Sequence, residues 1–284
     1  MNRIVEFYGH TVGTPATDWA RILQDENCDF TTQRCTKNRK SNSSIMIGTC
    51  SVLHGKKAPK PIIICPSRLA QQKKVFVACL GLLTGKLPGD ELHLIPEVKI
   101  AGGSVDYFLV AARGTAIIDF VGIELQSLDT TGTIWPERQR LVREFGMTPS
   151  DDAETVEKAC GINWKHTAKT TLMQIHHKVE TFQNVGKKLV LVLQDCLLDY
   201  MRKEFRFSHF KDPADPAHAL HIHAYNLTKP QDAGYALELA RTVSTDMAGI
   251  AQCLALQANA CWTLDDLHRV LAEKMKAETK IGTA

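Results

Sequence analysis

Apolar and polar positions along the middle of the chain predict a set of strands. Residues 105–110 and 117–126 are dominated by apolar and β-branched side chains, with polar residues at the ends rather than at helical spacing. Two such runs, separated by a short turn at 112–115, can pair as a hairpin. The fully apolar run 189–194 predicts a buried strand, and residues 219–225 predict another.

Helical spacing of apolar residues predicts helices between and after these strands. The expected segments are a short polar helix at 151–160, a helix over 167–185, a helix at 197–204, a mostly helical tail over 231–258, and a last helix over 264–277 capped by Thr263. Strands that alternate with helices are typical of a mixed α/β sheet flanked by helices. The pattern therefore predicts the α/β class.

Polar side chains in the two hairpin strands lie where they could form a metal site. Asp106 lies near the start of the first strand, and Glu124 and Gln126 lie near the end of the second. Side chains alternate across a strand, so Glu124 and Gln126 share one face, and a paired Asp106 could reach the same point. Two carboxylates suit Mg²⁺, which can activate water for in-line attack on a phosphodiester. Acids at strand ends are also common as solvated residues.

Cysteines are concentrated in the first quarter of the chain. Cys28, Cys35, Cys50 and Cys65 lie in segments that look too polar to build a core. The absence of an apolar signal stretch predicts a reducing, cytoplasmic compartment, where disulfides are rare. Four thiolates then favour a structural tetrahedral site for iron or Zn²⁺. The alternative is scattered buried thiols, which is how we interpret Cys79, Cys160, Cys196, Cys253 and Cys261.

Charge adds information by position rather than by total. The chain has 284 residues, 44% of them hydrophobic, and a formal net charge of +3, too little to indicate a nucleic-acid protein. Two basic groups are a possible phosphate clamp or simply solvated faces: Arg34, Lys37, Arg39 and Lys40, and then Arg138, Arg140 and Arg143. No P-loop, dinucleotide fingerprint or membrane span is evident, so ATP-driven and membrane roles are not expected.

Taken in order, these motifs resemble one family, the NotI-like type II restriction endonucleases, which have a PD-(D/E)xK core and an N-terminal Cys₄ iron site. The similarity covers roughly the first two thirds of the chain. It runs from Glu6-Phe7-Tyr8-Gly9 through the four cysteines, with Cys-Ser-Val at 50–52 and Cys-Pro-x-Arg at 65–68, to Asp106, Glu124-Leu125-Gln126 and Asn163-Trp164-Lys165-His166-Thr167.

The resemblance implies a set of roles. Asp106, Glu124 and Gln126 would be catalytic, with Gln126 at the usual Lys position, where that family accepts Gln, and Glu97 would be a further acid near the metals. Residues 1–75 would form a Cys₄ lobe that helps DNA recognition, and 76–284 the nuclease core with C-terminal helices. A homodimer would cut GC-rich palindromic double-stranded DNA with Mg²⁺, and a DNA methyltransferase would protect the host.

Several alternatives stay open from the sequence. The protein could be a non-catalytic Cys₄ DNA-binding protein, a redox or iron-sulfur protein, or a nuclease of relaxed specificity. The cation that replaces the motif Lys is unassigned, and Lys165 or Lys169 could supply it. His221 and His223 share one face of a predicted strand, where imidazoles would suit Zn²⁺ better than Mg²⁺.

Overall fold

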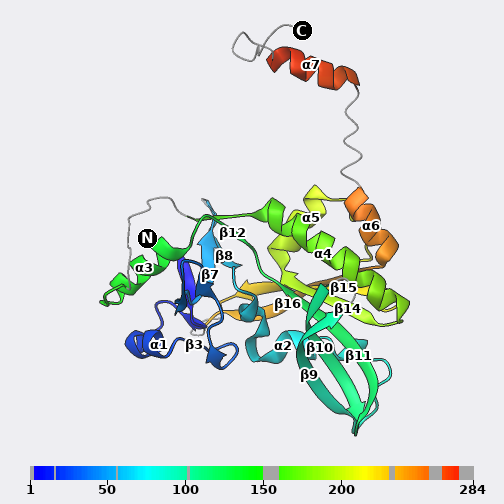
Figure 1. Cartoon of the computed structure of the whole chain (residues 1–284), viewed down its shortest axis with the longest axis horizontal. Coiled ribbons are helices and arrows are strands. Elements are labelled where there is room, and N and C mark those ends of the chain that lie inside the picture. The colour runs from blue at the N-terminus through cyan, green and yellow to red at the C-terminus, as the bar shows by residue number, and fades with distance from the viewer. Residues whose placement is uncertain are drawn as a thin grey trace.

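The computed structural model describes residues 3–15, 17–55, 57–100, 103–149, 160–229, 234–255 and 264–274. It is a mixed α/β structure, which confirms the predicted class (Figure 1). Its largest sheet has six strands in the order β16-β15-β14-β11-β10-β9. Their bounds are β9 Glu91–Ile100, β10 Gly103–Arg113, β11 Ala116–Gln126, β14 Lys188–Gln194, β15 Leu220–Thr228 and β16 Ala236–Thr245.

The centre of this sheet combines a hairpin with parallel strands. β10 and β11 pair antiparallel with Tyr107 opposite Ile123, which confirms the predicted hairpin. β11, β14 and β15 are parallel, and parallel neighbours need crossover connections. Helix α4 (Trp164–Asn184) lies in the crossover from β11 to β14, and α5 (Asp195–Glu204) connects β14 to β15. β9 and β16 close the two edges as antiparallel strands.

The two faces of the sheet bury different elements. On one face, α4 packs Leu172, Ile175 and Phe182 into the core. Gly122 of β11 allows this close approach, because a Cβ there would overlap the Phe182 ring. The other face is covered by η1 (Pro66–Lys73), α2 (Lys74–Val77) and η2 (Leu80–Leu82), which bury their apolar residues against β11 and β14.

A smaller lobe carries the early cysteines. Its four-stranded sheet has the order β2-β1-β7-β8, with β1 Ile4–Phe7, β2 His10–Thr11, β7 Thr49–His54 and β8 Lys60–Ile63. Helix α1 (Trp19–Asp25) and two hairpins complete it: β3 (Asn27–Cys28) with β4 (Gln33–Arg34), and β5 (Asn38–Arg39) with β6 (Asn42–Met46).

The expectation that this region is too polar to build a core was wrong. Phe7, Tyr8, Met46 and Val52 are all buried and belong to the main core. These apolar residues are scattered in the sequence. The antiparallel pairing of β1 with β7 and the hydrogen bond from the Tyr8 hydroxyl to the Met46 carbonyl bring their segments together. Sequence-local composition cannot reveal a core that is assembled from such distant pieces.

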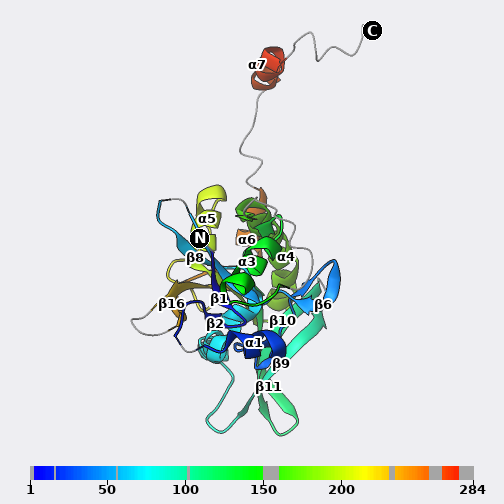
Figure 2. The same cartoon turned by 90° about the vertical axis from the view of Figure 1, so that its left-hand side faces the viewer.

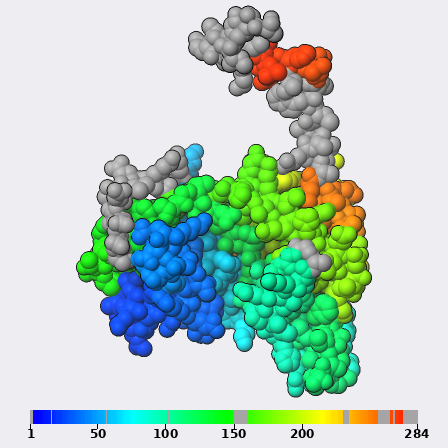
Figure 3. Space-filling view, in the orientation of Figure 1, coloured from blue at the N-terminus to red at the C-terminus, as the bar shows by residue number. Residues whose placement is uncertain are grey.

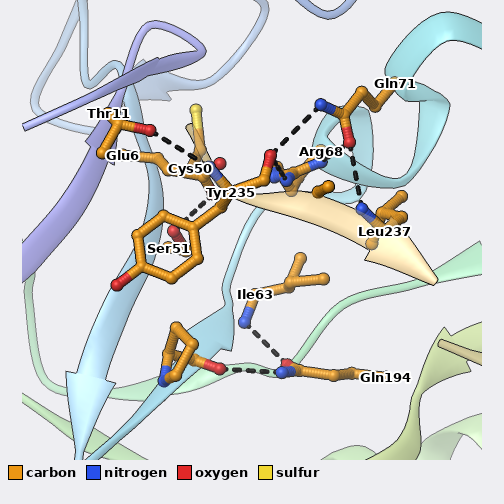
Figure 4. A network of polar contacts seen from close by, with 12 residues as sticks. Glu6, Thr11, Cys50, Ser51, Ile63, Arg68, Gln71, Gln194, Tyr235 and Leu237 are labelled. Carbon is orange, nitrogen blue, oxygen red and sulfur yellow. Dashed lines mark hydrogen bonds and ion pairs between the residues drawn. The ribbon is translucent and has the colours of Figure 1, made fainter. Parts of the chain in front are cut away.

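Buried polar groups join the lobe to the six-stranded sheet (Figure 4). Arg68 donates to Glu6 Oε2 at 2.8 Å and to the Tyr235 carbonyl oxygen at 2.9 Å, next to the start of edge strand β16. At a second place, the Gln194 side chain accepts from the Ile63 backbone N–H and donates to the Pro61 carbonyl. The lobe is therefore tied to two strands of the sheet, β14 and β16.

The C-terminal part differs from the expected helical tail. Residues 236–245 form edge strand β16, and within the described part of the tail the helix is confined to Met247–Ala255 (α6). The segment is rich in Ala, Leu and Glu, which favour helices, but pairing with β15 outweighs that local preference. Helix α7 (Leu264–Lys274) is drawn apart from the body in Figures 1 and 2. The sequence predicts a short helix over 151–160, of which residues 151–159 lie outside the described residues, as does the Thr263 cap.

Two short strands and one helix complete the connection between β11 and α4. β12 (Thr130–Thr131) pairs with β13 (Gly161–Ile162), and α3 (Trp135–Glu144) packs next to the lobe. Among the helices that the structure describes, none combines the length and the apolar character needed to cross a bilayer. Figure 3 shows the lobe in blue and the β9–β11 strands in teal on one face of the molecule.

Candidate active site

The hairpin brings Asp106 and Glu124 together. The pairing of Tyr107 with Ile123 places Asp106 opposite Glu124, and Asp106 Oδ2 accepts a hydrogen bond from the Leu125 backbone N–H at 2.8 Å. Both acids line a pocket of about 430 Å³ between β10, β11 and α4. Its other lining residues are Gly103, Ser104, Leu125, Gln126, Thr171, Gln174, Ile175, Lys178 and Leu191.

Helix α4 supplies a cation to this pocket. Lys178 Nζ donates to Glu124 Oε1 at 2.7 Å, and the two side chains are only 9% and 12% exposed. Lys165 and Lys169, the lysines considered from the sequence, do not line the pocket. The sequence pattern could have indicated that Lys178 is buried, because it lies next to Val179 and about one turn after Ile175, on the apolar side of the helix.

Burial makes the two acids unfavourable as a charged pair. It raises the pKa of Asp106, and the nearby Glu97 adds to that rise. The pKa of Glu124 is raised to about 7, chiefly by burial; Lys178 opposes the rise, and the negative charge of Asp106 adds to it. Two carboxylates thus share one ammonium group, and when both are ionised the pocket has an excess of negative charge that a cation would offset.

Glu97 and Gln126 border the same place. The pairs on either side, Val105 with Val98 and Tyr107 with Pro96, put Glu97 of β9 opposite Asp106 of β10. Glu97 is exposed and has a φ of 51°, a left-handed conformation that costs a non-glycine residue about 1 kcal/mol. Such outliers are concentrated at functional sites. Gln126 lines the pocket, and its amide donates to the Ser127 carbonyl at 2.6 Å.

The four early cysteines interact with one another in the lobe. Burial raises the pKa of the Cys35 and Cys50 thiols, and the nearby Cys28 and Cys65 raise both further. Backbone N–H groups of Lys37 and Gly48 stabilise a Cys35 thiolate. Among the described residues, however, no three His, Cys, Asp or Glu side chains form a group already arranged to hold a metal ion.

The later cysteines that the structure describes, and the two histidines of β15, are buried or partly buried. Cys79, Cys160 and Cys253 are buried and Cys196 is half-buried, while Cys261 lies outside the described residues. His221 and His223 are buried on β15, and burial lowers the pKa of each to about 4, so both are neutral at pH 7. Packing accounts for them.

A larger groove of about 1000 Å³ lies next to the pocket. It is lined by residues 37–41 of the lobe, by Ile47 and Ile64, and by residues 128–130 and 132–136. The first predicted basic group thus contributes Lys37, Arg39 and Lys40. The second group is divided: Arg138 is buried and donates to the Ile47 carbonyl, Arg140 is partly exposed and pairs with Glu137 at 2.9 Å, and Arg143 is exposed.

Comparison with known proteins adds no relative. No protein-family model matches the chain, and no curated protein is significantly similar to it. The functional argument therefore depends on the geometry of the pocket and on the sequence motifs.

Proposed function

We propose that the protein is a Mg²⁺-dependent DNA endonuclease. The observation that carries this proposal is the pocket in which Asp106, Glu124 and Lys178 converge from two strands and a helix. Two carboxylates that can hold a metal ion, with a lysine beside them, suit the hydrolysis of a phosphodiester. The position of Gln126 in the same pocket agrees with the Glu-x-Gln motif of a PD-(D/E)xK nuclease.

The donor set fits a hard divalent cation. Asp106 and Glu124 offer carboxylate oxygens, and their raised pKa values mean that a positive ion would stabilise the charged forms. Bound Mg²⁺ would polarise the phosphate and lower the pKa of water. The residues then have separate roles: Asp106 and Glu124 hold the cation, Lys178 offsets negative charge on the phosphate, and the Gln126 amide orients the attacking water.

The finer proposal is a homodimeric NotI-like type II restriction endonuclease that cuts GC-rich palindromic double-stranded DNA, with a methyltransferase in the same system. Its support is the order of the motifs along the chain. A two-fold pair of subunits matches the symmetry of a palindrome. Glu97, next to Asp106, is the further acid that this resemblance implies.

A structural metal in the lobe belongs to the same proposal. Cys28, Cys35, Cys50 and Cys65 supply four soft sulfur donors within electrostatic range of one another, which fits iron or Zn²⁺. Metal analysis of the purified protein tests it: about one equivalent of iron or zinc is expected, and Cys35→Ser should lose it. Metal retained in that variant, or absent from the wild type, would contradict the assignment.

The cleavage experiment uses unmethylated high-GC plasmid and phage DNA, in Mg²⁺ and in EDTA. Discrete Mg²⁺-dependent fragments are expected, and Asp106→Asn and Lys178→Met should abolish them. Lys165→Met is the matched control, since Lys165 is an exposed lysine on the same helix outside the pocket. A smear would exclude site specificity.

A second candidate, a non-catalytic DNA-binding protein, is favoured by one observation. Lys178 already neutralises Glu124, as in a purely structural ion pair. That candidate predicts intact DNA across diverse GC-rich substrates with a retained band shift. It also predicts that Lys178→Met lowers stability without changing any reaction.

A further inference from the structure

Residues that are close together in the chain line the pocket and the basic groove. Gln126 lines the pocket, and Leu128 to Thr130 line the groove. Two to four residues of chain span at most about 13 Å. Successive nucleotides of one DNA strand rise roughly 3.4 Å along the helix axis, so this span corresponds to about four nucleotides. A DNA strand with one phosphate in the pocket would therefore reach the groove with the next nucleotides.

The composition of the groove matches a nucleotide strand. Lys37, Arg39 and Lys40 outnumber its one acid, Asp129, whose carboxylate accepts from Thr167 Oγ1 at 3.1 Å. Lys40 is exposed at the rim. The walls also carry apolar surface from Ile134 and Trp135. In proteins that bind nucleic acid, basic side chains contact the phosphates, and apolar and aromatic side chains contact the bases. The groove offers both kinds of side chain.

Trp135 gives an independent indication of a ligand. It is 94% buried, yet its indole Nε1–H has no hydrogen-bond partner among the described residues. A buried donor without an acceptor is unfavourable, and such groups in a folded protein need an explanation. The guanidinium of Arg39 lies over the same ring, 4.4 Å from its centroid. If Arg39 moves toward a phosphate, an acceptor on the ligand can approach the indole.

We propose that this groove binds the DNA strand next to the cleaved phosphate. Arg39 leaves the Trp135 ring to contact a phosphate, Lys40 contacts a second one, and the Trp135 indole donates to an acceptor on the DNA. This inference rests on the proposed nuclease function, because it takes the pocket as the position of the scissile phosphate.

The test measures binding of a mixed-sequence DNA duplex over a range of KCl concentrations, with Ca²⁺ in place of Mg²⁺. Arg39→Ala and Lys40→Ala should each weaken binding about tenfold and flatten the slope of log K against log salt by roughly 0.9, the value for one lost phosphate contact. Lys203→Ala, an exposed lysine on α5 outside the groove, is the control and should change neither quantity.

Trp135→Phe keeps the ring and removes the donor. It should weaken binding roughly fivefold while the salt slope stays the same, because no charge is lost. Wild-type slope and affinity in both Arg39→Ala and Lys40→Ala would overturn the groove assignment, provided that the wild type cleaves DNA. A wild type that neither binds nor cleaves DNA contradicts the nuclease proposal itself, so the two failures are distinguishable.

Discussion

The candidate active-site pocket and the cysteine lobe each contain a largely buried glutamate, but the partners of the two carboxylates differ. In the lobe, Glu6 accepts from both Ser51 and Arg68, and Arg68 also donates to Gln71 and to the Tyr235 carbonyl. In the pocket, Glu124 has Lys178 as its partner and stands opposite a second acid, Asp106. Burial raises the pKa of both glutamates.

The difference in partners distinguishes a glutamate that stabilises the fold from one placed for chemistry. A buried acid inside a completed network of donors holds elements together, as Glu6 does between the lobe and edge strand β16. A buried acid that faces another acid lowers the stability of the fold, and such local conflict is expected at functional sites. Substitutions in the two regions should therefore affect different measurements.

The largest effect is expected from Asp106→Asn. We predict that cleavage falls by on the order of 10³-fold or more, because one metal-holding carboxylate is lost. The melting temperature should stay the same or rise, since the amide relieves repulsion with Glu124 and can still accept from the Leu125 N–H. Parallel digestion and thermal unfolding check this, and a large drop in melting temperature would place Asp106 with the structural acids.

Arg68→Met should chiefly lower the stability of the fold, in contrast to Asp106→Asn. It leaves the Glu6 carboxylate, which is 1% exposed, without its cation, and breaking a buried pair costs about 3–5 kcal/mol. Urea unfolding measures this loss. The double variant with Glu6→Gln should recover part of it, because the stranded charge is then removed. A loss below about 1 kcal/mol would show that the lobe tolerates disruption as a surface would.

The raised pKa of Glu124 should make the stability of the folded protein depend on pH. The pKa of Glu124 is raised from 4.5 to about 7, so between these values the folded protein binds more protons than the unfolded chain. Stability in metal-free buffer therefore falls as pH rises from 4.5 through 7, by on the order of 3 kcal/mol. Comparing wild type with Glu124→Gln isolates this contribution from other groups. Parallel curves for the two proteins would contradict the shift.

The smallest effect tests how the pocket is positioned. Gly122→Ala adds a Cβ that overlaps the Phe182 ring and pushes α4 away from β11. Overpacking of this kind costs about 1–3 kcal/mol. Because α4 carries Lys178, cleavage should fall along with stability. Gly114 lies at the hairpin turn with open space around it but at a φ of 57°, so Gly114→Ala should cost about 1 kcal/mol of stability and leave cleavage unchanged. Cleavage and unfolding measured on the same preparations decide between these outcomes.

The sequence predicted the parts of the fold that have local patterns. The β10–β11 hairpin, the buried strand β14 and helix α4 all show continuous periodicity, and the proximity of Asp106 to Glu124 follows from the hairpin register. Lys178 could not be predicted in the same way, because it reaches Glu124 across 54 residues through the packing of α4 on the sheet. The strand at 236–245 was also missed, since its pairing with β15 outweighs helix-favouring composition.

The bond from Arg68 to the Tyr235 carbonyl joins residues 167 positions apart. On the ribosome, the lobe with its four thiols is synthesised long before Tyr235, and domains that fold during synthesis do so from the N-terminus. The network that buries Arg68 is therefore completed late, after most of the chain has emerged. Until Tyr235 emerges, Arg68 lacks this acceptor, so the buried network around Glu6 is complete only when the C-terminal edge strand is in place.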